Sequence, residues 1–191
     1  MSMSDKNLKW KTLSSEYLFN DMWLKARKDK CERPDGKIVY PYYVMEYPEW
    51  VTGLALTKDN KVVLVRQYRQ ALGDECIEIP GGCVDATDES LEFAIRRELL
   101  EETGYAFDKA EMLGSTSANP STNSNLMHMF VLTGGERVQE QEQDANEDIE
   151  VLLVDLPEFM ALLTYNKFVQ SMHVTTIFYA LQKLGMLELK M

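Results

Sequence analysis

The stretch that decides the fold is Glu78–Tyr105, EIPGGCVDATDESLEFAIRRELLEETGY. A Pro-Gly-Gly turn and an acidic loop come first, and one apolar stripe at helical spacing follows, formed by Leu91, Ala94, Ile95 and Leu99. Residues 88–90 supply capping and negative side chains where a helix begins, and Gly104 provides the left-handed residue that ends one. We therefore predict a helix over residues 89–102 whose stripe faces a core.

Three carboxylates share this helix with the apolar stripe. At about 100° per residue, Glu98 and Glu102 fall inside the stripe and Glu101 lies at its edge. An unpaired buried charge costs several kcal/mol, and one ion pair with the nearby Arg96 or Arg97 cannot satisfy three carboxylates. Oxygen-rich clusters suit Mg2+ or Mn2+, so the pattern predicts a metal site. An ordinary surface helix is the alternative.

Length and composition indicate one domain with a small appendage. The chain has 191 residues, 45% of them hydrophobic, which is enough for a full core. A net charge of −11 argues against a nucleic-acid or anionic-membrane surface, but allows a phosphorylated ligand held through divalent cations. The sequence lacks an apolar run of membrane-spanning length, its start is polar, and its three cysteines follow no disulfide or metal spacing. We expect a cytoplasmic protein.

The residues before Val51 predict a small antiparallel sheet. Its strands are expected around Tyr17–Phe19, Trp23–Lys30 and Lys37–Glu46, the last two joined by a turn at 33–36. Further strands are expected at Val51–Thr57, Lys61–Tyr68, Asp74–Ile79, Ala110–Thr116, Leu126–Thr133 and Ile149–Asp155. Two more helices are expected at Leu156–Tyr165 and around residues 174–184.

The connections and the order of these elements indicate the fold class. A polar loop is expected at Ser117–Asn125, and the glycines at 134–135 are expected to turn the chain into a mobile acidic loop, Glu136–Asp148. The order predicts an α+β fold with a mixed sheet between helical layers. We place an N-terminal β appendage at residues 1–50 and the main domain at residues 51–191.

Residues Arg97–Tyr105, RELLEETGY, match the second half of the Nudix box, R-E-U-x-E-E-x-G-U with U a bulky apolar or aromatic residue, at every defined position. Glu89, eight residues before Arg97, lies where the box has a glutamate. The box glycine belongs six residues earlier, where this chain has Cys83. The acidic loop therefore contains either a one-residue insertion or a glycine-to-cysteine change, and adjacent glycines at 81 and 82 favour the insertion. The chain resembles Nudix hydrolases, which implies an α/β/α sandwich.

The resemblance implies a metal site on the predicted helix. In Nudix hydrolases the box glutamates hold divalent cations that bridge a diphosphate. By position, Glu98, Glu101 and Glu102 resemble those ligands, with a backbone carbonyl near Gly81 as an addition. Arg97 resembles the residue that orients a box glutamate, and with Glu101 it belongs to the expected catalytic set. The implied chemistry is attack of water on phosphorus in a P–O–P linkage, with Mg2+ as cofactor and Mn2+ as a substitute.

Segments outside the box resemble the ADP-ribose pyrophosphatase branch of the family. Residues 64–69, LVRQYR, followed by Glu78–Gly82, carry this resemblance. An arginine after the strand contacts a phosphate in that branch, and Arg69 has the matching position. Glu78 is expected either to brace the turn or to take part in metal binding.

Further substrate contacts are implied by position. Pro120, fifteen residues after Tyr105, lies where ADP-ribose hydrolases of the family have a proline, so the polar loop around it is expected to border the substrate. Trp50 is a candidate to stack on a nucleobase. The N-terminal sheet of this branch often takes part in such stacking across a dimer interface, so we expect a homodimer.

The general base is expected in the acidic loop. ADP-ribose pyrophosphatases that resemble this chain supply it from a mobile loop before a late strand. We select Glu147 because it closely precedes the strand predicted at residue 149; Asp144 and Glu150 are rivals. A solvated acidic loop without a catalytic member is the alternative.

The resemblance implies Mg2+-dependent hydrolysis of a nucleoside diphosphate linked to a sugar-like group, with ADP-ribose first, giving AMP and ribose 5-phosphate. A different nucleotide sugar such as GDP-mannose is the nearest alternative. A non-catalytic Nudix module that senses ADP-ribose would need a basic DNA-binding helix pair and eroded glutamates, and the sequence has neither. A structural acidic interaction protein would explain the charge but not the carboxylates on the apolar stripe.

Overall fold

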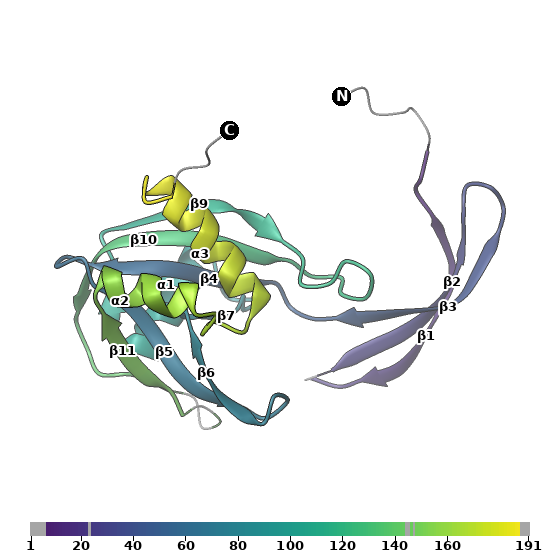
Figure 1. The fold of residues 1–191 in the computed structure, drawn as a ribbon. Helices are drawn as coiled ribbons and strands as arrows, with labels where there is room; N and C mark the ends of the chain where they lie inside the picture. Colours follow the sequence, from purple (N-terminus) through teal and green to yellow (C-terminus); the bar gives the residue numbers. More distant parts are fainter. Residues whose placement is uncertain (1–6, 23, 144–145, 147, 188–191) are drawn as a thin grey trace. The chain divides into compact units, whose positions relative to one another are not determined.

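The computed structural model describes residues 7–22, 24–143, 146 and 148–187, and Figure 1 shows the chain. The chain forms two compact units. The smaller comprises the chain up to Tyr47 together with Asn119–Asn125, and the larger comprises Pro48–Ala118 and the chain from Leu126 onward.

The smaller unit is a three-stranded antiparallel sheet in the order β1-β2-β3. Its strands are β1 (Lys11–Asn20), β2 (Lys25–Glu32) and β3 (Ile38–Glu46). The turn predicted between the last two is confirmed, because the Gly36 amide donates to the Arg33 carbonyl at 2.9 Å and Gly36 has φ 79°. The N-terminal β appendage therefore forms as expected, with a first strand longer than the predicted one.

The loop segment Asn119–Asn125 joins the smaller unit through β3. The Met45 amide donates to the Thr122 carbonyl at 2.7 Å, and the Met45 carbonyl accepts from the Ser124 amide at 3.1 Å. The segment thus pairs with the end of β3 almost as another strand would.

The larger unit contains a mixed sheet of eight strands in the described part of the chain. Its strands are β4 (Trp50–Thr57), β5 (Val62–Arg69), β6 (Asp74–Glu78), β7 (Gly81–Cys83), β8 (Tyr105–Ala106), β9 (Lys109–Thr116), β10 (Met127–Arg137) and β11 (Glu150–Val154). The central order is β11-β5-β4-β10-β8, while β6 pairs with β5, β7 with β4 and β9 with β10. The pair β4–β10 is parallel and the others are antiparallel.

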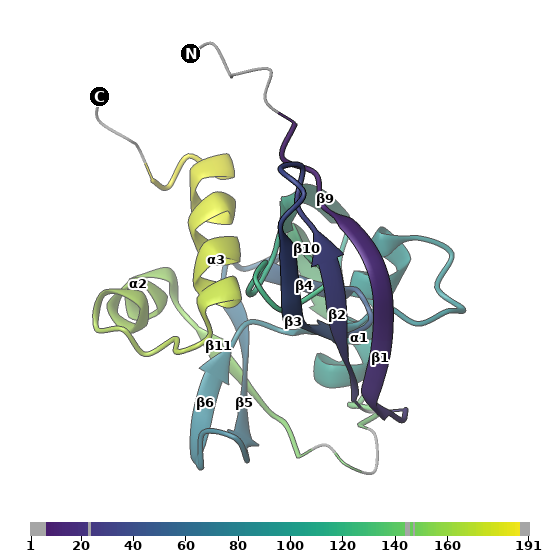
Figure 2. The ribbon, with the colours of Figure 1, turned by 90° about the vertical axis from the view of Figure 1, so that its right-hand side faces the viewer.

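Helices cover both faces of this sheet. They are α1 (Leu91–Thr103), α2 (Leu156–Thr164) and α3 (Ser171–Lys183), and Figure 2 shows α2 and α3 on one side and α1 on the other. Phe159, Phe168 and Ile177 centre the core under α2 and α3, and Ile95 and Leu99 centre the core under α1. The expected α/β/α sandwich is confirmed. None of the described helices is long and apolar enough to cross a membrane.

Two features of the larger unit differ from the sequence prediction. The short strands β7 and β8 were not expected, since strands of two or three residues have no pattern of their own. The turn predicted at Gly134–Gly135 is wrong, because β10 continues through both glycines to Arg137 with a register shift. A Cβ on Gly135 would lie 2.5 Å from the Phe107 ring, so the glycine allows a close approach rather than a reversal.

Candidate active site

Helix α1 presents its carboxylates as the helical wheel predicts. The Ser90 hydroxyl accepts from the Phe93 amide at 3.0 Å, which caps the helix, and Gly104 ends it with φ 75°. The helix therefore begins two residues later than expected. On its buried face Glu102 is 5% exposed. The side chain of Glu98 is 12% exposed and that of Glu101, at the edge of the stripe, is 39% exposed.

Arg97 connects two of these carboxylates to the acidic loop. Its Nη1 donates to Glu98 Oε1 at 3.1 Å and to Glu101 Oε2 at 2.9 Å. Its Nε and Nη2 donate to Asp88 Oδ1 and Oδ2, both at 2.9 Å, and Nη2 also donates to the Cys83 carbonyl at 3.0 Å. These partners raise the pKa of Arg97, with the Asp88 hydrogen bonds contributing most. The guanidinium has a fixed orientation as a result.

The acid that pairs with Arg97 is Asp88, and not Glu89, which lies where the box has a glutamate. The Asp88 side chain is 1% exposed, whereas Glu89 is exposed to solvent. The hydrogen bonds from Arg97 hold the pKa of Asp88 below its ordinary value. Asp88 lies six residues after Gly82, which is the spacing the box requires between glycine and acid. This spacing agrees with a one-residue insertion, but an insertion would then lie between Asp88 and Arg97 rather than before Glu89, where we expect it from the sequence.

The glycine turn lies directly against the carboxylates of α1. The Gly81 amide donates to Glu102 Oε2 at 2.9 Å, and a Cβ on Gly81 would lie 2.2 Å from the Val51 carbonyl oxygen. A Cβ on Gly82 would lie 2.4 Å from Glu98 Oε2. Gly81 thus requires glycine, because a side chain there would displace the neighbouring strand, while a side chain at Gly82 would displace the Glu98 carboxylate.

Arg69 forms an ion pair with the buried Glu78, which lies next to this turn in the chain. Arg69 Nε donates to Glu78 Oε1 at 3.0 Å and Nη2 donates to Oε2, while Gln67 Nε2 lies 3.4 Å from Glu78 Oε2. The hydrogen bond with Glu78 raises the pKa of Arg69. Glu78 is 3% exposed and the Arg69 side chain is 42% exposed. A buried carboxylate requires such a partner, and Arg69 supplies it. Bracing of the turn and metal binding both stay predictions for Glu78.

The other residues predicted to bind substrate or to act as the base lie in different segments of the chain. Trp50 is half-buried at the start of β4, opposite Cys83 in the β4–β7 pair. Pro120 is exposed and belongs to the smaller unit. Among the base candidates, Glu147 and Asp144 lie outside the described residues, and Glu150 accepts from Arg66 Nε at 2.7 Å.

The three carboxylates of α1 have partners within the protein, and they also suit a divalent cation. Among the described residues, no three His, Cys, Asp or Glu side chains already form a group that could hold a metal ion. Glu98 and Glu101 point to Arg97, and Glu102 accepts from the glycine turn. The donors nevertheless suit a hard cation, since all are carboxylate oxygens of one helix and the Glu98 carboxylate lies where a Cβ of Gly82 would be.

Two family profiles match consecutive parts of the chain. Residues 48–172 match the profile described as NUDIX domain. The chain belongs to the Nudix family. Residues 10–45 match the profile of the nucleoside diphosphate sugar hydrolase N-terminal domain, which corresponds to most of the three-stranded sheet.

Several curated relatives cover most of this chain. It is 28% identical over 170 residues to the methanol dehydrogenase activator of Bacillus methanolicus, covering 88% of this chain and 91% of that protein. It is 30% identical over 159 residues to the ADP-ribose pyrophosphatase of Bacillus subtilis, covering 83% and 85%. It is 29% identical over 170 residues to the GDP-mannose pyrophosphatase of Cronobacter sakazakii, covering 85% and 86%.

A solved structure described as an ADP compounds hydrolase has the same fold. The TM-score is 0.81 at 23% sequence identity, and the match covers 96% of this chain and all of the other. Structure and family profile thus agree on a Nudix fold with an N-terminal sheet.

Proposed function

We propose that this Nudix pyrophosphohydrolase cleaves the diphosphate of a nucleoside diphosphate linked to a sugar-like group, with ADP-ribose as its first substrate and AMP and ribose 5-phosphate as products. The observation that carries the proposal is the set of three carboxylates on α1, two of them bonded to Arg97, against the glycine turn. The similarity to the ADP-ribose pyrophosphatase of Bacillus subtilis and the nucleoside diphosphate sugar hydrolase profile support the substrate class.

Glu98, Glu101 and Glu102, with a carbonyl near Gly81, would hold Mg2+, and Mn2+ would substitute. When bound, the cation would lower the pKa of the attacking water and would neutralise charge on the leaving phosphate. Arg97 would hold the carboxylates of Glu98 and Glu101 near each other, because one edge of its guanidinium donates to both and Asp88 anchors the other edge.

We propose substrate contacts for three residues. Arg69 would bind a phosphate, since its fork to Glu78 fixes the guanidinium while the side chain stays partly exposed. Trp50 would stack on the base, and Pro120 would border the substrate. Replacing Arg69 with Lys, which cannot form the fork, should raise KM more than it lowers kcat; an unchanged KM would remove this assignment.

Glu147 remains our choice of general base. The ion pair of Glu150 with Arg66 makes Glu150 the weaker rival. Glu147→Gln should slow turnover without loss of metal binding, and Glu150→Gln is the matched control. An unaffected rate in the first variant would move the base elsewhere.

The experiment that tests the function is a screen of diphosphates for released phosphate esters, with and without Mg2+. ADP-ribose should be hydrolysed fastest, and only with the metal. GDP-mannose is the second candidate, because a GDP-mannose pyrophosphatase covers this chain about as fully as the ADP-ribose enzyme does. A clear preference for GDP-mannose would change the substrate, and no hydrolysis of any diphosphate would refute the proposal.

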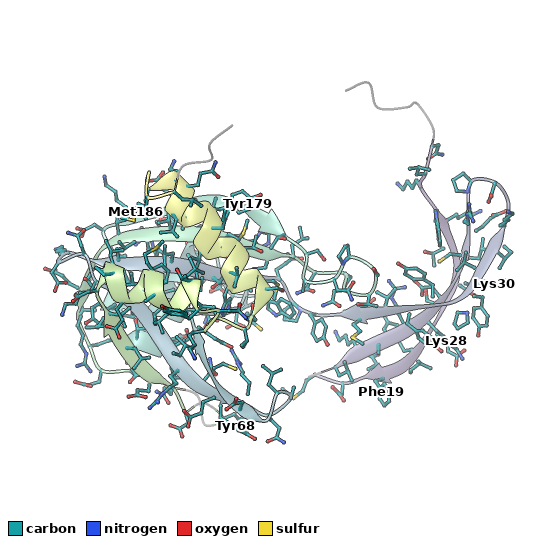
Figure 3. The ribbon with its side chains drawn as sticks, in the orientation of Figure 1. Phe19, Lys28, Lys30, Tyr68, Tyr179 and Met186 are labelled. Carbon is teal, nitrogen blue, oxygen red and sulfur yellow. The ribbon has the colours of Figure 1, made fainter. Side chains whose placement is uncertain are left out.

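A homodimer and a cytoplasmic location complete the proposal. The three-stranded sheet exposes large apolar side chains, among them Phe19 at 59%, Tyr40 at 56% and Tyr43 at 54%, and Figure 3 shows Phe19 projecting from it. All three cysteines are free, as in a reducing compartment. Sedimentation should give twice the chain mass of 22.0 kDa for the wild type and a smaller species for Phe19→Glu; a monomeric wild type would refute the dimer.

A further inference from the structure

The chain between β10 and β11 returns along the C-terminal end of α1. The Val138 amide donates to the Gly104 carbonyl at 2.9 Å, and the Glu142 amide donates to the Glu101 carbonyl at 2.9 Å. A Cβ on Gly104 would lie 2.3 Å from the Gln139 carbonyl oxygen, so the close approach requires glycine. This segment is therefore attached to the last turn of α1, the helix that carries the three carboxylates. The final carbonyls of a helix need partners outside it.

Two glutamine side chains extend the attachment to β11. Gln141 Nε2 donates to the Glu102 carbonyl at 2.6 Å and to the Ile149 carbonyl at 3.0 Å. Gln143 Nε2 donates to the Ile149 carbonyl at 2.6 Å, and Gln143 Oε1 accepts from the Ile149 amide at 3.2 Å. Ile149 is 4% exposed, so its main-chain polar groups depend on these partners rather than on water.

These bonds determine where the chain enters β11. The primary amide of Gln143 pairs with both main-chain groups of Ile149, as a neighbouring strand would, and Gln141 connects Ile149 to the main chain of Glu102. Glu102 is also the residue whose carboxylate meets the glycine turn. The entry to β11 is thus connected by hydrogen bonds to a predicted metal ligand.

The hydrogen bonds of the Gln141 and Gln143 side chains to Ile149 and Glu102 form a clamp. Acidic residues lie on both sides of Ile149, the residue that this clamp holds. Asp148 precedes Ile149 and Glu150 follows it, and both border a cavity of about 510 Å3 together with Gln67 of β5. Tyr68, labelled in Figure 3, borders the same cavity, and Gln67 in turn lies against Glu78. The acidic entry to β11 therefore faces β5, with which β11 pairs, while Gln141 connects it to α1.

We propose that Gln141 and Gln143 are positioning residues for diphosphate hydrolysis. They hold the entry to β11 at Ile149, which lies between Asp148 and Glu150, in a fixed place beside Glu102. Neither amide titrates, so the clamp stays intact over the whole pH range in which the carboxylates change charge. The proposal rests on the proposed function, because it assigns both residues a role in that reaction.

The kinetic test replaces each glutamine with Met, which has a similar length and lacks the amide. Gln141→Met and Gln143→Met should each lower kcat about ten- to a hundredfold, since small misplacements of reacting groups have effects of this size. KM and Mn2+ affinity should change by less than about threefold, because the carboxylates of α1 keep their own partners. Gln139→Met is the matched control, since Gln139 reaches Gly104 through its main-chain amide and should retain wild-type kcat.

A second measurement needs no substrate. Hydrogen exchange of the Ile149 amide should be at least about tenfold faster in Gln143→Met than in the wild type or the Gln139→Met control, because the acceptor of that amide is gone. If no diphosphate is hydrolysed, the proposed function fails while the exchange result still decides whether the clamp exists. Wild-type kcat in both variants, unchanged exchange at Ile149, or an equal loss of kcat and Mn2+ affinity would each overturn the proposal.

Discussion

Replacing Asp88 with Asn tests the interpretation of the acidic loop most directly. The Asp88 carboxylate accepts from Arg97 through two hydrogen bonds of 2.9 Å, and it also accepts from the Asp85 amide at 2.8 Å. Asparagine has the same shape but no charge. Arg97 keeps Glu98 and Glu101 as partners, so the fold should survive while the guanidinium loses its anchor.

The expected loss is about 2 kcal/mol in the free energy of unfolding. Breaking a fully buried ion pair costs about 3–5 kcal/mol, and a hydrogen bond to a charged group contributes about 1.5–3 kcal/mol. We expect a loss below the cost of breaking a fully buried pair, because the Arg97 side chain is 20% exposed and the substituted asparagine retains an acceptor oxygen.

The pH dependence has a definite sign. Arg97 lowers the pKa of Asp88 in the folded state from its ordinary 3.8. A carboxyl group with a lowered pKa stabilises the fold above its unfolded pKa, and this contribution is lost as the pH falls below about 3.8. The Asp88→Asn protein should therefore show a shallower loss of stability in that acidic range than the wild type.

Urea unfolding followed by tryptophan fluorescence, at neutral pH and between about pH 3 and 4, measures both effects. Glu89→Gln is the matched control, because Glu89 is the adjacent exposed acid and its loss should change stability by less than about 0.5 kcal/mol. If Glu89→Gln were the more destabilising change, the assignment of Asp88 as the box acid would be wrong.

Three further predictions follow from the site and from the buried histidine. Glu102→Gln should lower the rate at least about a hundredfold with folding intact, since Gln still accepts from the Gly81 amide but carries no charge for a metal; near wild-type turnover would remove the metal assignment. Gly82→Ala should weaken Mn2+ binding about tenfold in a titration, because its Cβ displaces the Glu98 carboxylate, and unchanged affinity would contradict this reasoning. Burial lowers the pKa of His173 from 6.5 to about 4, so the unfolded chain binds more protons between these values and stability should fall by up to about 3 kcal/mol as the pH decreases through that window. His173→Gln should remove this slope, and equal slopes in urea unfolding would show that another group causes it.

Helix α1 could be predicted in detail because its pattern is local. A residue's place on a helix depends on its neighbours three and four positions away, so Glu98 and Glu102 could be assigned to the buried face without knowledge of the fold. The cap and the end of the helix have equally local causes, which are the Ser90 hydroxyl and the left-handed Gly104. Central strands β4 and β5 were recognisable because continuous apolar runs are typical of strands covered on both faces.

The acidic loop before the helix could be predicted only in part. Counting back from Arg97 selects Glu89, whereas counting forward from Gly82 selects Asp88, and the sequence contains no local signal that chooses between them. The choice is made by the packing of β7 on β4, which places the loop so that Asp88 is buried against Arg97.

The sequence by itself determined the helix, its carboxylate face, the fold class and the family, because each depends on short-range periodicity or on a contiguous motif. Only the tertiary structure decided which partners these residues have. The fork of Arg69 to Glu78 and the bonds from Gln141 and Gln143 to Ile149 join side chains whose partners are not encoded in the local sequence pattern, even where the strands that carry them are. Hydrogen bonds of this kind depend on where the sheet and α1 bring the backbone, and that placement results from burying two apolar cores at once.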